Sequence, residues 1–257
     1  MRRLICALLM FGPVAAHAYE TVEVAEGGKV TGVVTLAGDP PEPKRATFPE
    51  DLDPKDAKLC NGKRPLIRPF YSTGENDGLA NVVVWIEGIE RGKAKKKELG
   101  YMINEDCLFD PHVQTLDVGA KVQIENQDPI LHTTHAISQG QRITMFNVGM
   151  PRKGQVAQKK VRRPGILKIQ CDSGHTWMRA WIHAFMHPYH TVTDADGKFE
   201  IADVPPGTYT LKFWHENSGT QSKTITVSPS GTVTEAVTFE AQPLPKGHEH
   251  GHAHQHG

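Results

Sequence analysis

The sequence lacks a long hydrophobic run, an excess of charge of either sign and a rich supply of cysteine. After the first eighteen residues no segment approaches 18 consecutive apolar residues, which argues against a transmembrane helix in the mature chain. The 29 basic and 29 acidic residues balance, which argues against a nucleic-acid-binding protein. No paired-carboxylate site or nucleophile elbow is recognisable, so nothing in the sequence indicates an enzyme.

The first eighteen residues, MRRLICALLMFGPVAAHA, have the features of a secretory signal peptide. Arg2 and Arg3 precede a short apolar run, and Ala16-His17-Ala18 forms a small-x-small cleavage site. An internal helix is the alternative, but the run is too short to span a bilayer. We therefore expect residues 1–18 to be removed before Tyr19, and the mature protein to be periplasmic or secreted.

Three cysteines remain after removal of the signal peptide: Cys60, Cys107 and Cys171. Cys60 and Cys107 have no histidine or second cysteine at ligand spacing, so these two are the natural disulfide pair in an oxidising compartment. The bridge would close a loop of about 48 residues. On the chain-entropy model this stabilises the folded state by about 4 kcal/mol. Cys171 is then left over, as a buried inert thiol, a reactive group or a metal ligand.

Short alternating runs separated by Gly, Pro and Asp predict an all-β protein, with one possible helical period around residues 51–59. About seven strands, in segments 29–41, 78–89, 193–216 and 223–240, predict one antiparallel sandwich. Two hairpins are expected in it, one at Asp196-Gly197 and one between residues 223 and 240. The strand patterns between residues 112 and 185 predict a second β domain inserted into the first.

The stretch CDSGHTWM, which begins at Cys171, places a thiol, an imidazole and a thioether within eight residues. In the preceding strand GILKIQC, Cys171 shares a face with Leu167 and Ile169, so its thiol points inward at the strand end. A tight turn then allows His175 and Met178 to converge on the sulfur, because three or four loop residues reach well beyond the diameter of a metal's coordination shell.

A second imidazole is supplied by NQDPILHTTHA, where His132 follows Asn126 by six residues. His135 points to the opposite strand face, so His132 is the preferred ligand and His135 a possible accessory one. Thiolate, two imidazoles and a weak axial thioether form a copper site of the cupredoxin kind. Zinc is the rival metal, although methionine is a poor ligand for it. Without a metal, Cys171 would be a plain buried thiol and its neighbours ordinary core and turn residues.

Several other polar and aromatic residues have two interpretations. Asn126 and Asp128 flank the His132 loop, where they either fix it by hydrogen bonds or act only as turn formers. Trp177 and Trp181 either cover the site from water or pack in a core. The remaining histidines of the mature domain are expected to be structural or exposed: His112, His183, His187, His190 and His215.

The motifs NQDPILH and GILKIQCDSGHTWM resemble those of the cupredoxin family, in which an asparagine precedes the first histidine and a cysteine, a histidine and a methionine follow on the last hairpin. The spacing Cys171-x3-His175-x2-Met178 resembles the second half of the copper loop in the binuclear domain of cytochrome oxidase. The first cysteine of that loop would fall at Leu167. The resemblance therefore implies one copper ion.

The stretches GGKVTGVVTLAGDPP and TVTDADGKFEIADVPPGTYTLKFWHE resemble the two ends of a carboxypeptidase regulatory-like, transthyretin-type sandwich. The mature chain is similar to bacterial exported proteins that insert a cupredoxin Greek-key sandwich into that domain, often labelled methylamine-utilisation or plastocyanin-like. The resemblance implies an outer sandwich over residues 19–95 and 188–241 and a copper domain over residues 96–187. It suggests electron transfer and carries no peptidase chemistry.

The last residues, 242–257, include the tail KGHEHGHAHQHG, which cannot form a core and suits metal capture as a disordered strand. A purification tag is the alternative. The accessory ligands expected there are His248, His250, His252, His254 and His256.

Two functions compete on this evidence. The first is a periplasmic one-electron carrier that docks transiently with a redox protein such as a cytochrome. The second is a copper storage or delivery protein that uses the tail as collector.

Overall fold

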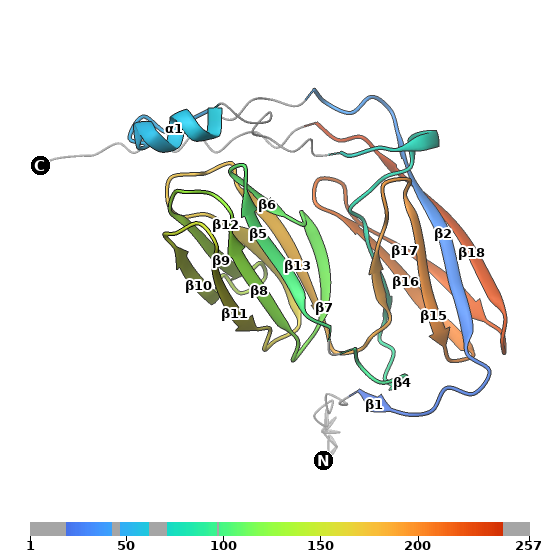
Figure 1. The fold of residues 1–257 in the computed structure, drawn as a ribbon. Coiled ribbons are helices and arrows are strands. Elements are labelled where there is room, and N and C mark those ends of the chain that lie inside the picture. Colours follow the sequence, from blue (N-terminus) through green and yellow to red (C-terminus); the bar gives the residue numbers. More distant parts are fainter. Residues whose placement is uncertain (1–18, 43–46, 62–70, 97, 244–257) are drawn as a thin grey trace, which may run out of the picture.

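Two β-sandwiches lie side by side in the computed structural model of the chain (Figure 1). The structure describes residues 19–42, 47–61, 71–96 and 98–243. The chain leaves the first, outer sandwich after β3 (Val83–Glu87), builds an inserted sandwich, and returns in β14 (His190–Val192), which pairs antiparallel with β3. The all-β class predicted from the sequence is confirmed. The expected signal peptide lies outside the described residues.

The outer sandwich consists of a four-stranded and a three-stranded sheet. The four-stranded sheet has the order β14, β3, β16 (Gly207–His215) and β17 (Gly219–Val227). The three-stranded sheet has the order β15 (Lys198–Val204), β2 (Gly28–Ala37) and β18 (Thr232–Glu240). Two short strands, β1 (Glu20–Thr21) and β4 (Arg91–Gly92), pair with each other in parallel.

Two features of the outer sandwich differ from the sequence prediction. The turns at Asp196-Gly197 and between β17 and β18 do not close hairpins, because each carries the chain from the four-stranded sheet to the three-stranded sheet. In addition, β18 pairs with β2 in parallel, so the sandwich is not wholly antiparallel. A crossing between sheets uses the same turn residues as a hairpin, and the turn signal alone does not separate the two.

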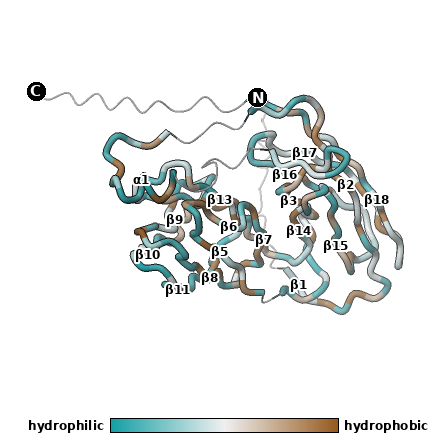
Figure 2. Tube along the Cα trace, turned by 45° about the horizontal axis from the view of Figure 1, so that its top comes forward, coloured by the Kyte–Doolittle hydropathy of each residue, from teal (hydrophilic) through white to brown (hydrophobic). Residues whose placement is uncertain are grey.

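The inserted sandwich also has two sheets, both built from the chain between β3 and β14. The five-stranded sheet has the order β10 (Thr144–Met150), β9 (His132–Ser138), β12 (Gly165–Gln170), β13 (Arg179–Phe185) and β7 (Val113–Asp117). The four-stranded sheet has the order β11 (Gln155–Lys160), β8 (Lys121–Asn126), β5 (Gly100–Glu105) and β6 (Leu108–Asp110). The edge strand β11 alternates between exposed and half-buried residues, and its tube is largely hydrophilic in Figure 2.

Two strands face apolar neighbours on both sides, which explains their nearly continuous apolar sequences. In β3, Val84 and Ile86 enter the core of the outer sandwich, whereas Val83 faces the inserted sandwich. In β13, Ile182 enters the core of the inserted sandwich, whereas Trp181 faces the outer one. The two sandwiches therefore share an apolar interface.

The interface also contains buried polar contacts. Glu216, in the turn after β16, accepts hydrogen bonds from Arg179 Nε at 3.2 Å and from Trp181 Nε1 at 2.9 Å. Its other carboxylate oxygen lies 2.5 Å from His112 Nε2. Burial raises the pKa of Glu216, but the contacts with His112 and Arg179 outweigh it and lower that pKa to about 2. The carboxylate is thus charged inside the interface.

One segment from the first part of the chain packs on the inserted sandwich. The helix α1 (Pro54–Asn61) lies over one end of it (Figure 1), and a disulfide joins Cys60 to Cys107, the pair expected from the sequence. Leu52 and Leu59 pack against the same core. The helical period expected around residues 51–59 is therefore present, but its partner is the inserted sandwich and not the outer one. A 3-10 turn, η1 (Glu75–Asp77), follows later.

Candidate metal centre

Strand pairing brings the two halves of the predicted site together. His132 is the first residue of β9, and Cys171 follows the last residue of β12. The two strands pair antiparallel with Gln170 opposite His135, so the start of β9 lies beside the end of β12. His175 then lies in the loop between Cys171 and β13. Residues far apart in sequence thus meet at one end of a rigid sheet.

Three ligand atoms converge at this point. His132 Nδ1 lies 3.1 Å from His175 Nδ1, and Cys171 Sγ lies 3.9 Å from the first and 3.5 Å from the second. Both imidazoles are fully buried and the cysteine is 5% exposed. The structure therefore brings together three of the four predicted ligands.

The separations fit a bound transition metal. A circle through three atoms at these distances has a radius of about 2 Å, close to metal bonds of about 2.0 to 2.3 Å to imidazole nitrogen and thiolate sulfur. An ion in the plane of the three atoms would thus reach all of them without movement of the backbone. One thiolate and two imidazoles suit copper, and they also suit zinc.

The cysteine is held in the form that binds metals. Burial raises the pKa of the Cys171 thiol, but hydrogen bonds from His132, His175 and the amides of Thr133 and Ser173 outweigh it and lower that pKa to about 5. The Thr133 amide donates to the sulfur at 3.3 Å. At neutral pH the side chain is a thiolate, which is the ligand form.

Asp128 fixes the orientation of His132. Its Oδ2 lies 3.0 Å from His132 Nε2 and accepts a hydrogen bond from the Cys107 amide at 2.9 Å, while Oδ1 accepts one from the Asp106 amide at 3.1 Å. A carboxylate at Nε2 favours a proton on that nitrogen, so the proton that Nδ1 shares with the sulfur is the one that a metal would replace. Asn126 supports the same loop, because its side chain donates to the carbonyl of Ile130 at 2.9 Å.

His175 has a carboxylate at the same position of its ring. Asp56 Oδ2, from α1, lies 3.3 Å from His175 Nε2, in a contact that is not aligned as a hydrogen bond. Asp56 was not among the site residues predicted from the sequence. The signal that could have found it is an acidic side chain at helical spacing among the inward residues Leu52, Leu59 and Cys60. A carboxylate in such a position needs a polar partner.

Met178 and the two tryptophans have different surroundings. Met178 is fully buried, and its amide donates to the carbonyl of His175 at 3.0 Å; its role as axial ligand stays a prediction. Trp177 covers the loop, with its ring 5.4 Å from that of His175 and its Nε1 bonded to the Cys107 carbonyl. Trp181 does not cover the site, because alternation along β13 turns it toward the outer sandwich.

The other candidate ligands lie outside the triangle of atoms. His135 has both ring nitrogens engaged, with Asp172 at 2.7 Å and with Thr144 at 2.7 Å. A second group of potential ligands, Cys107 with Asp128 and His132, lacks a thiolate because Cys107 is in the disulfide. The tail histidines lie outside the described residues. Most of the remaining histidines are buried: His112, His183, His187 and His215.

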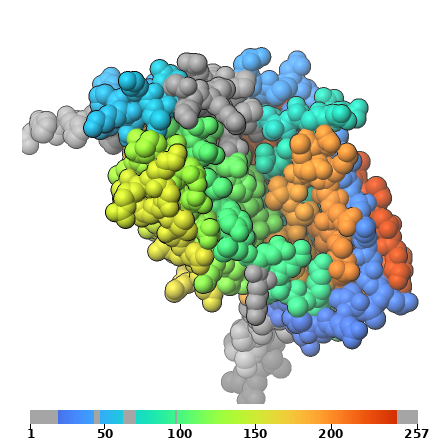
Figure 3. Space-filling view, in the orientation of Figure 1, coloured from blue at the N-terminus to red at the C-terminus, as the bar shows by residue number. Residues whose placement is uncertain are grey.

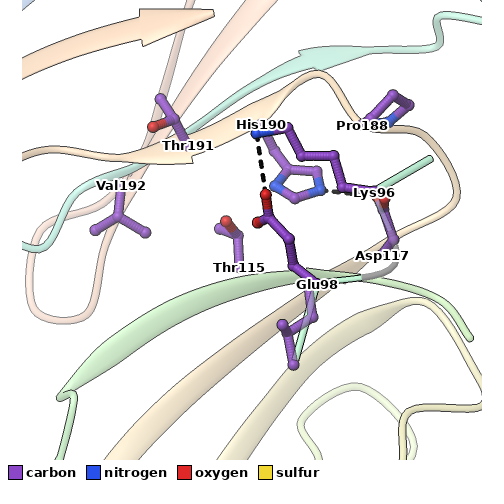
Figure 4. A pocket seen from close by; sticks show the side chains of 9 residues that line it. Lys96, Glu98, Thr115, Asp117, Pro188, His190, Thr191 and Val192 are labelled. Carbon is purple, nitrogen blue, oxygen red and sulfur yellow. Dashed lines mark hydrogen bonds and ion pairs between the residues drawn. The ribbon is translucent and has the colours of Figure 1, made fainter. Parts of the chain in front are cut away.

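A polar pocket lies between the sandwiches, with none of the predicted metal ligands in its wall (Figure 4). Its volume is about 190 Å³. His190 Nε2 lies 3.1 Å from Asp117 Oδ1 on one side, and Lys96 pairs with Glu98 on the other. These groups do not converge on one point as ligands, so the pocket is not the metal centre.

Comparison with known families identifies one part of the chain. The family model of the carboxypeptidase regulatory-like domain matches residues 180–240. Residues 180–240 of this chain are similar to that domain. The match covers β14 to β18 of the outer sandwich and also β13, which the structure places in the inserted sandwich. Halomucin of Haloquadratum walsbyi is 27% identical over 132 residues, which are 48% of this chain and 1% of halomucin.

Solved structures with a similar fold include copper proteins. A purple cupredoxin from Nitrosopumilus maritimus has a TM-score of 0.30 and 21% identity, over 34% of this chain and 99% of that one. Amicyanin from Paracoccus versutus has a TM-score of 0.30 and 18% identity, over 34% and 82%. A copper-containing nitrite reductase from Thermus scotoductus has a TM-score of 0.29 and 19% identity, over 36% and 24%. Likenesses at this level carry no weight for the metal centre, whose assignment depends on the ligand geometry.

No helix in the described part of the chain has the length and apolar character needed to cross a membrane.

Proposed function

We propose that the inserted sandwich is a cupredoxin-type domain that binds one copper ion and that the protein carries single electrons in the periplasm. The proposal depends on the convergence of His132 Nδ1, His175 Nδ1 and Cys171 Sγ within 3.1 to 3.9 Å in a buried site. Met178 would supply a fourth ligand in this proposal. Bound copper would supply exchange of one electron between its two oxidation states.

The protein's own residues make such exchange rapid by holding the ligands in place. The sulfur accepts a hydrogen bond from Thr133 N, and the ring of His132 is fixed by Asp128. His132 and Cys171 lie next to strand ends of one sheet, so a change of charge would require little movement. This preorganisation suits a carrier that neither binds nor converts a substrate.

The outer sandwich serves in this proposal as a scaffold, with boundaries at residues 19–95 and 188–241 around the copper domain at 96–187. The helix α1 is the exception, because residues in and beside it pack on the copper domain. The partner is a redox protein such as a cytochrome. Export by the signal peptide at residues 1–18 would place the protein where a disulfide forms.

Copper loading tests the function. The protein lacking residues 242–257, loaded with Cu(II), should bind one copper and show intense visible absorption from the thiolate–copper bond, with a reversible potential. Cys171→Ala should abolish the absorption, and His135→Ala should retain it as the matched control. A loaded protein with zinc bound in preference and no visible band would contradict the proposal.

Copper storage or delivery is the second candidate, and the histidine-rich sequence of the tail favours it. Under this function the full-length protein should bind several more copper ions than the tail-deleted form and pass copper to an acceptor protein without redox cycling. Fast electron exchange by the tail-deleted protein would favour the carrier.

A further inference from the structure

A short segment from outside the inserted sandwich covers the metal ligands. The segment comprises residues 48–61, including α1, and is called the cap below. Its blue atoms lie directly on the inserted sandwich in Figure 3. The disulfide between Cys60 and Cys107 ties the cap down. The cap is thus joined covalently to the part of the chain whose backbone holds Asp128.

The cap contacts the ligand loop itself. Phe48 packs on Trp177 with ring centroids 5.0 Å apart. Leu52 lies so close to Gly174 that a Cβ there would be 3.2 Å from its Cδ1. Gly174 and Trp177 flank His175, and the ring of His175 is fully buried. The imidazole is therefore closed off from solvent beneath the cap.

Asp56 is the charged residue on the inward face of the cap. Asp56 and Cys60 are spaced by four residues and share one face of α1, and Leu52 lies just before that helix. The Asp56 side chain is 17% exposed, although burial of a carboxylate is unfavourable unless it is paired. Its partner is His175 Nε2 at 3.3 Å.

The two imidazoles therefore have similar surroundings, although only Asp128 makes an aligned hydrogen bond to its ring. Each directs Nδ1 toward the Cys171 sulfur and Nε2 toward a carboxylate, Asp128 for His132 and Asp56 for His175. Asp128 belongs to the loop that leads into β9, whereas Asp56 is present only because the cap is folded down. A carboxylate behind a metal-bound imidazole orients the ring and strengthens it as a ligand.

We propose that the cap completes the metal centre, with Asp56 as a positioning residue for His175 and the cap as a cover that slows exchange of the metal. This inference rests on the proposed function. An isolated helix of eight residues is not stable in water, so the position of the cap depends on the disulfide and on the contacts of Phe48 and Leu52. The centre is then a closed site that opens only when the cap lifts.

Copper release tests the proposal. The copper-loaded full chain is mixed with excess of a copper chelator, and the loss of the visible band is followed in time. Asp56→Asn keeps the shape of the side chain and removes its charge. We expect it to weaken copper binding about 10- to 100-fold, the range for loss of a partner behind a metal-bound histidine, and to release copper faster than the wild type.

The matched control is Asp51→Asn, because Asp51 is an exposed acid of the same segment. It should release copper at the wild-type rate. Leu52→Ala should speed release by opening the cover, while the band position, set by ligands that it does not touch, stays unchanged. Asp56→Asn should shift the band as well, which a purely structural role would not do. Wild-type release and an unshifted band for Asp56→Asn would overturn the positioning role.

Hydrogen exchange of the metal-free protein separates this inference from the proposed function. Amides of residues 174–178 should exchange faster in Leu52→Ala and in the double variant Cys60→Ser/Cys107→Ser than in the wild type. If the double variant fails to fold, Leu52→Ala alone decides. A wild type that binds no copper would defeat the proposed function, and equal exchange in Leu52→Ala and the wild type would defeat the cap.

Discussion

Asp128 Oδ2 lies 3.0 Å from Nε2 of His132 and so sets the direction in which that ring presents Nδ1. Asp128→Asn removes the charge that keeps the proton on Nε2. We expect copper affinity to fall about 10- to 100-fold, measured by competition with a chelator. Asp172→Asn is the control, because it makes the same change beside Cys171 but its partner, His135, has both ring nitrogens engaged away from the three converging ligand atoms. Equal copper affinity of Asp128→Asn and Asp172→Asn would show that Asp128 does not support the metal centre.

Glu216 should be critical for the interface between the sandwiches. Glu216→Gln leaves Arg179 and His112 at the interface without its negative charge. Because breaking a buried ion pair leaves a charge poorly compensated, we expect a loss of about 3 kcal/mol in the free energy of unfolding, measured with urea. Glu200→Gln, in an exposed pair with Lys29, should cost less than about 1 kcal/mol.

Acid should destabilise the protein through buried histidines. Burial, and next the charge of His190, lower the pKa of His183 to about 3, so His183 stays neutral in the folded protein. An unfolded histidine binds a proton below about pH 6.5. Between about pH 6.5 and pH 3 the unfolded state therefore binds more protons, and stability falls by about 1.4 kcal/mol per pH unit.

The comparison of unfolding free energies for the wild type and His183→Phe isolates this effect from the other titrating groups. The difference between the two proteins should be constant above about pH 7 and should shift in favour of the variant as the pH falls to 5. Parallel curves over that range would show that His183 becomes protonated without unfolding.

Two glycines with the same backbone conformation should differ in their tolerance of alanine. Gly197 has φ +75° and a Cβ there would lie 2.1 Å from the Val34 carbonyl oxygen, whereas Gly154 has φ +76° and open space around it. Gly154→Ala should cost about 1 kcal/mol, for the left-handed conformation alone. Gly197→Ala should cost several kcal/mol more in thermal or urea unfolding, because the turn between the sheets must move.

The sequence was sufficient for the elements that leave a local pattern. The alternation in β15, the two-sided apolar run in β3 and the cysteine left after pairing of Cys60 with Cys107 each predicted what the structure contains. The convergence of His132 with the loop after Cys171 followed from strand geometry. Strand register and strand pairing could not be predicted in the same way. A crossing between sheets and a hairpin use the same turn residues, as at Asp196-Gly197.

Long-range contacts explain what the sequence did not predict. Asp56 and Glu216 each lie far along the chain from the residues they contact, and neither has a motif around it. The role of Trp181 stayed open between covering the site and packing in a core, because a single strand has two faces and the sequence does not show that both are covered. The contacts of such residues can be assigned only when the neighbouring elements in the fold are known.

The return of the chain in β14, beside the β3 strand from which it left, and the disulfide from Cys60 to Cys107 give the inserted sandwich three covalent attachments to the rest of the chain. A domain joined by a single linker can rotate relative to its neighbour, whereas a domain attached at several points cannot. A partner bound to the outer sandwich would therefore approach the buried thiolate in one fixed orientation.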